Sequence, residues 1–274
     1  MPEGPEIRLE ADRLHKALAG REASTVQFAH EHLLDRGAEL EGRRVESVTS
    51  RGKAMLTAFE GDLVIYSHNQ LYGVWRVVKA GTRPETTRQL RLVIENDKKA
   101  ALLYSASDIE LLERSELAGH PFLRRLGPDV LDTDVDVDTV LRRLEDDRFR
   151  RRSLGALLLD QGFVAGLGNY LRAEILFTSG VHPASRSQDL NSRERALLAS
   201  EILRVTRQSY RTKGVTNDLE RVERLKADGV PRRRFRFHVY KRDGRGCYRC
   251  ESEIERFDQG GRAIFVCPLC QPEA

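Results

Sequence analysis

The stretch RVESVTSRGKAMLTAFEGDLVIYSH, residues 44–68, decides the fold of the N-terminal half of the chain. It contains three short strand-like runs, separated by turn-forming residues at Arg51-Gly52-Lys53 and at Gly61. Three similar runs follow it. The six strands that we expect are residues 44–50, 54–60, 62–68, 73–79, 89–95 and 100–105. Because no helix separates them, they predict an antiparallel β-sandwich or barrel.

A helix is expected before these strands. Ile7, Ala11, Leu14 and Leu18 recur at helical spacing, and Gly20 marks the end of the pattern. An apolar stripe of this kind packs on a core, so it would hold the first residues of the chain at a helix N-terminus. The macrodipole at that end favours anions such as phosphate.

The chain begins Met1-Pro2-Glu3-Gly4-Pro5-Glu6, and removal of Met1 would give Pro2 a secondary α-amine beside the Glu3 carboxylate. An α-amine titrates at roughly 7.7 to 8.0, so part of it is nucleophilic near neutral pH. Its attack on the anomeric carbon of a sugar would give a cationic iminium, with Glu3 as general acid and then as base. Taken alone, Pro2 and Pro5 are equally consistent with ordinary helix-start residues, with Pro5 at the first helical position.

The C-terminal half follows an Asp-rich linker, residues 126–136, and its pattern is helical. We expect helices at 137–144 with Asp136 as N-cap, at 153–164, at 170–178, and from about Asn191 with Glu194 completing a capping box. Glycines in the turn 165–169 let it be tight and let the next helix offer amides to phosphate. Residues 213–236 are charge-rich and poorly patterned, which predicts a mobile or short-helical segment.

All four cysteines lie near the C-terminus, as Cys247-x2-Cys250 and Cys267-x2-Cys270 with 16 residues between the pairs. This spacing is typical of a tetrahedral four-cysteine zinc site, and we expect one structural zinc ion without an open position for water. Disulfides are the alternative, which a chain without an export signal disfavours. Between the pairs, residues 253–257 and 263–267 predict a β-hairpin with Gly260-Gly261 at its tip. Arg262, beside the tip, is either a phosphate ligand or an ordinary exposed residue.

The composition fits a soluble protein of two domains, with 274 residues, 40% hydrophobic content and a net charge of +4. No apolar run reaches the ~18 residues needed to span a bilayer, and the start has no signal-peptide pattern, so we expect a cytoplasmic protein without membrane contact. Basic residues cluster late, which suits nucleic-acid binding where other signals for it lie nearby, while arginine runs by themselves are usually solvated faces. The clusters are Arg148, Arg150, Arg151 and Arg152, and Arg232, Arg233, Arg234, Arg236, Lys241, Arg242 and Arg245.

The opening six residues resemble the formamidopyrimidine-DNA glycosylase/endonuclease VIII family of DNA repair enzymes. Gly166-Leu167-Gly168-Asn169-Tyr170 is similar to the helix-two-turn-helix motif of that family, and Gly261-Arg262 with Cys267-Pro268-x-Cys270-Gln271 is similar to its zinc finger. The resemblance covers both ends of the chain and its middle.

The resemblance implies roles for individual residues. Pro2 would be the nucleophile and Glu3 its proton-transfer partner, while Lys53, otherwise a solvated turn residue, would reach the lesion. Asn169 and Arg262 would bind DNA phosphate. Gln70, Leu71 and Tyr72, which could instead lie in the core, would fill the gap left by an extruded nucleotide. In place of the second, Arg-Arg-Phe-Gly-type loop of the purine-directed branch, the chain has Ser105-Ala106-Ser107-Asp108-Ile109.

We therefore expect an α+β multidomain enzyme: a catalytic β-sandwich with an N-terminal helix at 1–125, the linker, a helix-two-turn-helix domain at 137–235, and a four-cysteine zinc finger at 236–274. The expected activity is that of a bifunctional DNA glycosylase and abasic-site lyase. It would remove oxidised pyrimidines from damaged double-stranded DNA and cleave the strand by β- and δ-elimination, as a monomer in the bacterial cytoplasm, on the nucleoid when bound to DNA. The alternatives are an 8-oxoguanine or formamidopyrimidine glycosylase of the same family and a non-enzymatic zinc-dependent nucleic-acid-binding protein.

Overall fold

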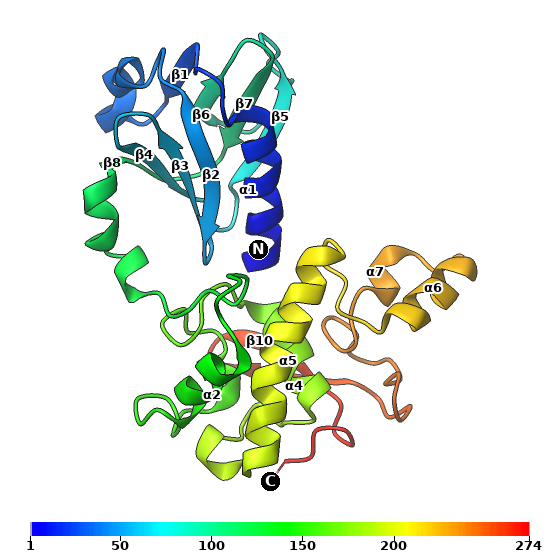
Figure 1. Ribbon diagram of the computed structural model, residues 1–274. Helices are drawn as coiled ribbons and strands as arrows, with labels where there is room; N and C mark the ends of the chain where they lie inside the picture. The colour runs from blue at the N-terminus through cyan, green and yellow to red at the C-terminus, as the bar shows by residue number, and fades with distance from the viewer. Residues whose placement is uncertain (1, 274) are drawn as a thin grey trace. The chain divides into compact units, whose positions relative to one another are not determined.

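The computed structural model describes residues 2–273, and the chain divides into two compact units, Met1–Arg125 and Leu126–Ala274 (Figure 1). Unit 1 contains two four-stranded antiparallel sheets. In spatial order the first holds β2 (Val45–Arg51), β3 (Ala54–Phe59), β4 (Leu63–His68) and β8 (Asp108–Glu113). The second holds β1 (Thr25–Phe28), β6 (Leu90–Glu95), β7 (Lys99–Tyr104) and β5 (Val74–Lys79). Short 3₁₀ turns lie at Glu31–Glu39, Arg114–Ala118 and Leu123–Arg125.

One hydrophobic core contains buried side chains of both sheets of unit 1, so the predicted antiparallel sandwich is confirmed. Val48 and Met55 from the first sheet and Leu92 and Leu103 from the second are among its buried side chains. All six predicted strands form, within one residue of their expected limits. The sandwich has two further strands, β1 and β8, which the predicted set did not include.

The N-terminal helix is α1 (Gly4–Leu18), and it buries the predicted stripe of Ile7, Ala11, Leu14 and Leu18. The helix lies along β2, where the backbone N–H of Val48 donates to His15 Nδ1 over 3.2 Å (Figure 1). Because burial of the stripe removes four apolar side chains from water, the helix is fixed on the sandwich and its N-terminus has a defined position.

Unit 2 is built around α4 (Asn169–Ser179), in which every residue from Tyr170 to Phe177 is buried. Such a helix is surrounded on all sides. The other helices are α2 (Val137–Glu145), α3 (Leu154–Leu157), α5 (Ser192–Arg211), α6 (Leu219–Ala227) and α7 (Arg232–Phe235), with a 3₁₀ turn at Ser187–Asp189. The hairpin consists of β9 (Glu255–Gln259) and β10 (Arg262–Val266), with Gly260 and Gly261 at its tip as predicted.

The predicted caps of α2 and α5 are confirmed. Asp136 Oδ1 accepts the Thr139 N–H over 2.8 Å, and Asn191 and Glu194 form the capping box of α5. The segment 213–236 is short-helical, with a small core of its own around Val215, Val222 and Phe235.

The helix predicted at 153–164 is wrong, because the helical turn of α3 ends at Leu157. After it, side chains bind the backbone in place of a helical ladder. Asp160 Oδ1 accepts the Gly162 N–H over 2.8 Å, and Gln161 Nε2 donates to the Leu167 carbonyl over 2.9 Å. Polar side chains that bond nearby backbone in this way compete with helix formation.

Residues 126–136 pack into unit 2. Val130 is fully buried in its core, and the Gly127 N–H donates to the Gln161 carbonyl over 2.8 Å. The C-terminal hairpin shares that core through Ile264. Among residues 2–273, no helix combines the length and the apolar character that a membrane crossing requires.

Candidate functional site

The start of α1 is held in place by its own cap and by β2. Glu3 is the N-cap residue and is buried, with its N–H donating to Glu6 Oε2 over 3.1 Å. One turn further along, Arg8 Nε donates to Ser50 Oγ over 2.8 Å. Pro2, half-buried, directly precedes this cap. Residues 2 and 3 therefore have a fixed position, while Met1, on which the amine of Pro2 depends, lies outside the described residues.

Lys53 sits in the turn between β2 and β3, three residues after the Ser50 that binds α1. Gly52 has φ of 61°, a conformation that glycine adopts without strain, and Lys53 beside it is half-buried. The start of α1 and the Lys53 turn thus lie at the same end of β2.

His68 and Asp108 join this end of the sandwich, and the sequence analysis missed both. In the sheet register, His68 pairs with Ala54 on one side and with Asp108 on the other. Burial lowers the pKa of His68; the Lys53 charge lowers it further, and Asp108 opposes the shift. Asp108 is distant from His68 in sequence, and the pairing of β4 with β8 places the two residues opposite each other.

The loop after β4 exposes two large apolar side chains. Leu71 is 57% exposed and Tyr72 is 69% exposed, so the alternative that both lie in the core is wrong. The loop is nevertheless firmly held, because the Gly73 N–H donates to the Asn69 carbonyl over 2.7 Å and the Gln70 N–H to His68 Nδ1 over 3.2 Å. A Cβ on Gly73 would lie 2.6 Å from Asn69 Cα, so only glycine fits there.

Two neighbouring segments support this loop. Ser107 Oγ donates to Gln70 Oε1 over 3.0 Å, and Arg88 Nη1 donates to the Tyr72 carbonyl over 2.8 Å. Residues 105–107 form a short connection that leads directly from β7 into β8. The Leu71 and Tyr72 side chains are therefore presented on a rigid support.

Asn169, the first residue of α4, lies beside the start of β10 in unit 2. Its Nδ2 donates to the Ala263 carbonyl over 2.9 Å, and its Oδ1 accepts from Arg172 Nη2 over 2.6 Å. Arg262 precedes Ala263 and is exposed. The hydrogen bond joins two residues 94 positions apart in the sequence, Asn169 and Ala263. It places Asn169 beside the backbone that carries Arg262.

Arg172 makes this junction rigid, and sequence reasoning missed it. Its side chain is fully buried, and Nη1 donates to the Gly155 carbonyl over 3.1 Å while Nη2 also reaches Ala263. An arginine is almost never fully buried unless its donors are paired. The carbonyl partners of Arg172 come from distant segments, so the sequence pattern does not distinguish this residue from a surface arginine.

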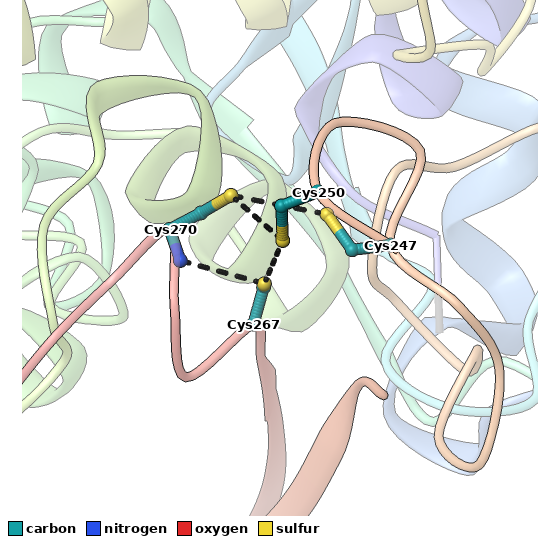
Figure 2. A group of neighbouring side chains, drawn as sticks. All are labelled: Cys247, Cys250, Cys267 and Cys270. Carbon is teal, nitrogen blue, oxygen red and sulfur yellow. Dashed lines mark hydrogen bonds between the residues drawn. The ribbon is translucent and has the colours of Figure 1, made fainter. Parts of the chain in front are cut away.

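The four cysteines converge on one point (Figure 2). Their sulfur atoms all lie within 4.8 Å of one another, with Cys250 Sγ 3.4 Å from Cys267 Sγ and 3.5 Å from Cys270 Sγ. Burial is the largest cause that raises the pKa of Cys267 and Cys270. Four thiolates at this separation repel one another unless a cation lies among them, so the donor set fits a tetrahedral metal ion.

Comparison with known proteins gives consistent results along the chain. The formamidopyrimidine-DNA glycosylase N-terminal domain matches residues 1–106, and the formamidopyrimidine-DNA glycosylase H2TH domain matches residues 126–220. Endonuclease 8 of Pectobacterium carotovorum is 47% identical and that of Escherichia coli O9:H4 is 48% identical, each over 99% of this chain and 100% of the relative.

Solved structures share the fold at lower identity. Lactococcus lactis formamidopyrimidine-DNA glycosylase, non-covalently bound to DNA with an abasic site, aligns with a TM-score of 0.80 at 21% identity over 99% of this chain and 100% of that one. The same enzyme with DNA containing an oxidised pyrimidine gives 0.81. The sandwich, the helical unit and the four-cysteine cluster define the class of DNA glycosylases with abasic-site lyase activity that act in base excision repair. Within that class, the chain belongs to the formamidopyrimidine-DNA glycosylase/endonuclease 8 family.

Proposed function

We propose that this glycosylase removes oxidised pyrimidines from duplex DNA, forms a Schiff base through Pro2, and cleaves the strand by β,δ-elimination. The observation that carries the pyrimidine assignment is the short connection 105–107, which is bonded to Gln70 and leaves Leu71 and Tyr72 as the exposed apolar pair at this loop. Gln70, Leu71 and Tyr72 would then fill the space of the extruded nucleotide from a single loop. A damaged pyrimidine that has lost its aromatic character stacks weakly, which lowers the cost of extrusion.

Pro2 is proposed as the nucleophile. Its secondary amine attacks C1′ of the extruded nucleotide and the damaged base leaves with a proton. The C1′–O4′ bond then breaks as O4′ takes up a proton, which opens the sugar ring and gives an iminium that takes up electrons from the C2′–H bond. Loss of that proton expels the 3′-phosphate, and a second elimination expels the 5′-phosphate, which leaves a one-nucleotide gap. Burial of Glu3 beside Pro2 supports its role in protonating the leaving group or ring oxygen and then in removing the C2′ proton.

Lys53 is proposed to contact the phosphate or sugar at the lesion and to assist ring opening. The support is its position at the same end of β2 that the Arg8–Ser50 hydrogen bond ties to α1. A lysine there carries a compact positive charge, which would stabilise negative charge as it develops on a sugar or phosphate oxygen.

In unit 2 we propose that Asn169 and Arg262 bind DNA phosphates and that Cys247, Cys250, Cys267 and Cys270 hold one structural Zn²⁺. The four thiolates leave no position for water, so the metal would fix the hairpin that presents Arg262 and take no part in the chemistry. The proposed partner is damaged double-stranded DNA. We propose that the protein binds it as a monomer in the bacterial cytoplasm.

Single-turnover excision from duplexes that carry one defined lesion tests this specificity. We expect thymine glycol and dihydrouracil to be excised faster than 8-oxoguanine paired with cytosine. Faster excision of 8-oxoguanine would assign the chain to the purine-directed branch of the family and overturn the proposal.

Replacement of Leu71 and Tyr72 by alanine should slow excision from duplex DNA by about 10- to 100-fold, because the two side chains together replace the stacking of one extruded base, which contributes roughly 1–3 kcal/mol. Cleavage of single-stranded abasic DNA requires no filled stack and should change little. Since both side chains are exposed, the fold should tolerate the change. Val74→Ala, at a third exposed apolar position, is the matched control. Equal slowing on both substrates would remove the loop from the extrusion step.

Arg262→Ala should weaken binding to every duplex sequence alike and lower the salt slope of log K by about 0.9, as expected for one lost phosphate contact. Arg256→Ala, in the paired strand β9 and also exposed, is the matched control. Fluorescence anisotropy between 50 and 200 mM salt, roughly the range in which phosphate contacts dominate, measures both quantities. An unchanged slope would place Arg262 outside the DNA interface.

A further inference from the structure

Unit 2 contains a pocket of about 450 Å³ that none of the residues assigned above lines. It lies between the C-terminal half of α5, the N-terminal end of α6 and the first cysteine pair, and its wall includes Arg204, Arg221, Arg249 and His238. A volume of this size falls within the range of small-molecule sites, ~300–1,000 Å³.

The guanidinium groups of the pocket differ in how they are used. Arg204 is neutralised by two hydrogen bonds to Glu201, of 2.7 and 2.6 Å. Arg221 and Arg249 bond neutral groups instead, since Arg221 Nη1 donates to Asn217 Oδ1 over 3.0 Å and Arg249 Nη1 donates to the Phe177 carbonyl over 3.2 Å. In the described part of the chain, neither guanidinium group bonds a carboxylate directly, although the charge of Arg249 also acts on Glu201, so both keep donors for an anion.

His238 lines the pocket and is only 6% exposed. Its ring lies against Phe177, with centroids 5.2 Å apart, and its Nδ1 has no hydrogen-bond partner among residues 2–273. A buried polar atom without a partner costs ~1–3 kcal/mol. Burial, followed by the charges of Arg249, Arg221 and Arg204, lowers the pKa of His238 to about 3, so the ring is neutral and the local field is positive.

Two acidic residues, Asp218 and Glu220, also line the pocket and are exposed. Asp218 Oδ1 is engaged as the N-cap of α6, accepting the Arg221 N–H over 2.8 Å. Carboxylates at the exposed side repel a continuous phosphate backbone, while a single compact anion can pass them to reach the arginines. The charge pattern therefore favours a small anion over duplex DNA.

We propose that this pocket binds a phosphate monoester of about nucleotide size, with Arg221 and Arg249 on the phosphate and the neutral ring of His238 in the wall of the pocket. The ligand would connect α5, α6 and the first cysteine pair, and so stabilise the N-terminal end of α6. None of its lining residues is among those proposed for base excision.

Calorimetry on the zinc-loaded full chain, at constant ionic strength, tests the site with dTMP as the probe and thymidine as its uncharged counterpart. We expect saturable binding of dTMP, competition by inorganic phosphate and no binding of thymidine. Arg221→Gln should weaken dTMP binding at least about tenfold, as loss of a charge-assisted hydrogen bond implies. Arg224→Gln, exposed on the same helix but outside the pocket, should bind like the unaltered chain.

Two further measurements separate the sources of phosphate and guard against misfolding. A short single-stranded oligonucleotide with a 5′-phosphate, compared with its dephosphorylated form, distinguishes a DNA end from a free nucleotide; either supports the site if the phosphate is required. In the unaltered chain, dTMP should slow amide exchange at residues 216–222. Three binding results would overturn the proposal: no saturation up to about 10 mM dTMP, well above ordinary small-ligand dissociation constants, equal binding of thymidine, or displacement of dTMP by an undamaged duplex. Equal effects of Arg221→Gln and Arg224→Gln on dTMP binding, or unchanged amide exchange at residues 216–222, would overturn it as well.

Discussion

A chain that keeps Met1, or carries one added residue before Pro2, is expected to lose at least about 1,000-fold in base excision and to give no covalent product with borohydride. The reason is chemical: the nitrogen of Pro2 would then be an amide, which cannot form an iminium with C1′. The cap at Glu3 and the bond between Arg8 and Ser50 do not involve residue 1, so α1 should remain in place.

DNA binding provides the control for this variant. The phosphate contacts proposed for Asn169 and Arg262 belong to unit 2, which folds around its own core. Affinity for a duplex should therefore change little while chemistry is lost. If the blocked chain is trapped as efficiently as the mature one, Pro2 is not the nucleophile, whatever its affinity for DNA.

Removal of zinc is expected to have the second largest effect. The core of the C-terminal module contains Cys247 and Cys267 together with Phe265 of the hairpin and Phe177 of α4. In small zinc modules the metal supplies about 10–16 kcal/mol of apparent binding free energy at neutral pH, which is also folding free energy. Without it, the hairpin loses its support and the Asn169–Ala263 contact is lost with it.

Cys250→Ser should therefore bind less than one zinc per chain and weaken duplex binding by about 100-fold or more, since loss of the phosphate contacts of the hairpin removes several kcal/mol. Leu269→Ser, in the second cysteine pair and 66% exposed, is the matched control because it changes no ligand. At DNA concentrations that saturate the Cys250→Ser chain, borohydride trapping should persist. Full zinc content and normal affinity in that variant would contradict the proposed site.

Local pattern predicted most of the fold because the elements concerned have strong periodicity or explicit end signals. The stripe from Ile7 to Leu18 and the Asn191–Glu194 capping box are examples, and both form as expected. The failure at 153–164 has a physical cause, since apolar residues there are buried by tertiary contacts while Asp160 and Gln161 bond the backbone locally. The spacing of apolar residues alone does not predict such hydrogen bonds.

Some residues of the candidate site could likewise be predicted from the local sequence and others could not. Residue spacing predicted the cluster of Cys247 with the other three cysteines. The local sequence at the glycine-rich turn predicted Asn169. Buried Arg172 and the pairing of His68 with Asp108 could not be predicted in this way, because the first depends on carbonyl groups supplied by other segments and the second on strand register. Interactions between distant segments become visible only when the chain is folded.

Identification of the residue that becomes attached to DNA tests the central claim most directly. The mature chain is incubated with a duplex containing a single thymine glycol in the presence of borohydride, which reduces the iminium to a stable amine, and the adduct is located by peptide mass spectrometry. We predict that the nucleotide is found on the nitrogen of Pro2 in the N-terminal peptide. An adduct on the Nζ of Lys53, or on any other lysine, would contradict it.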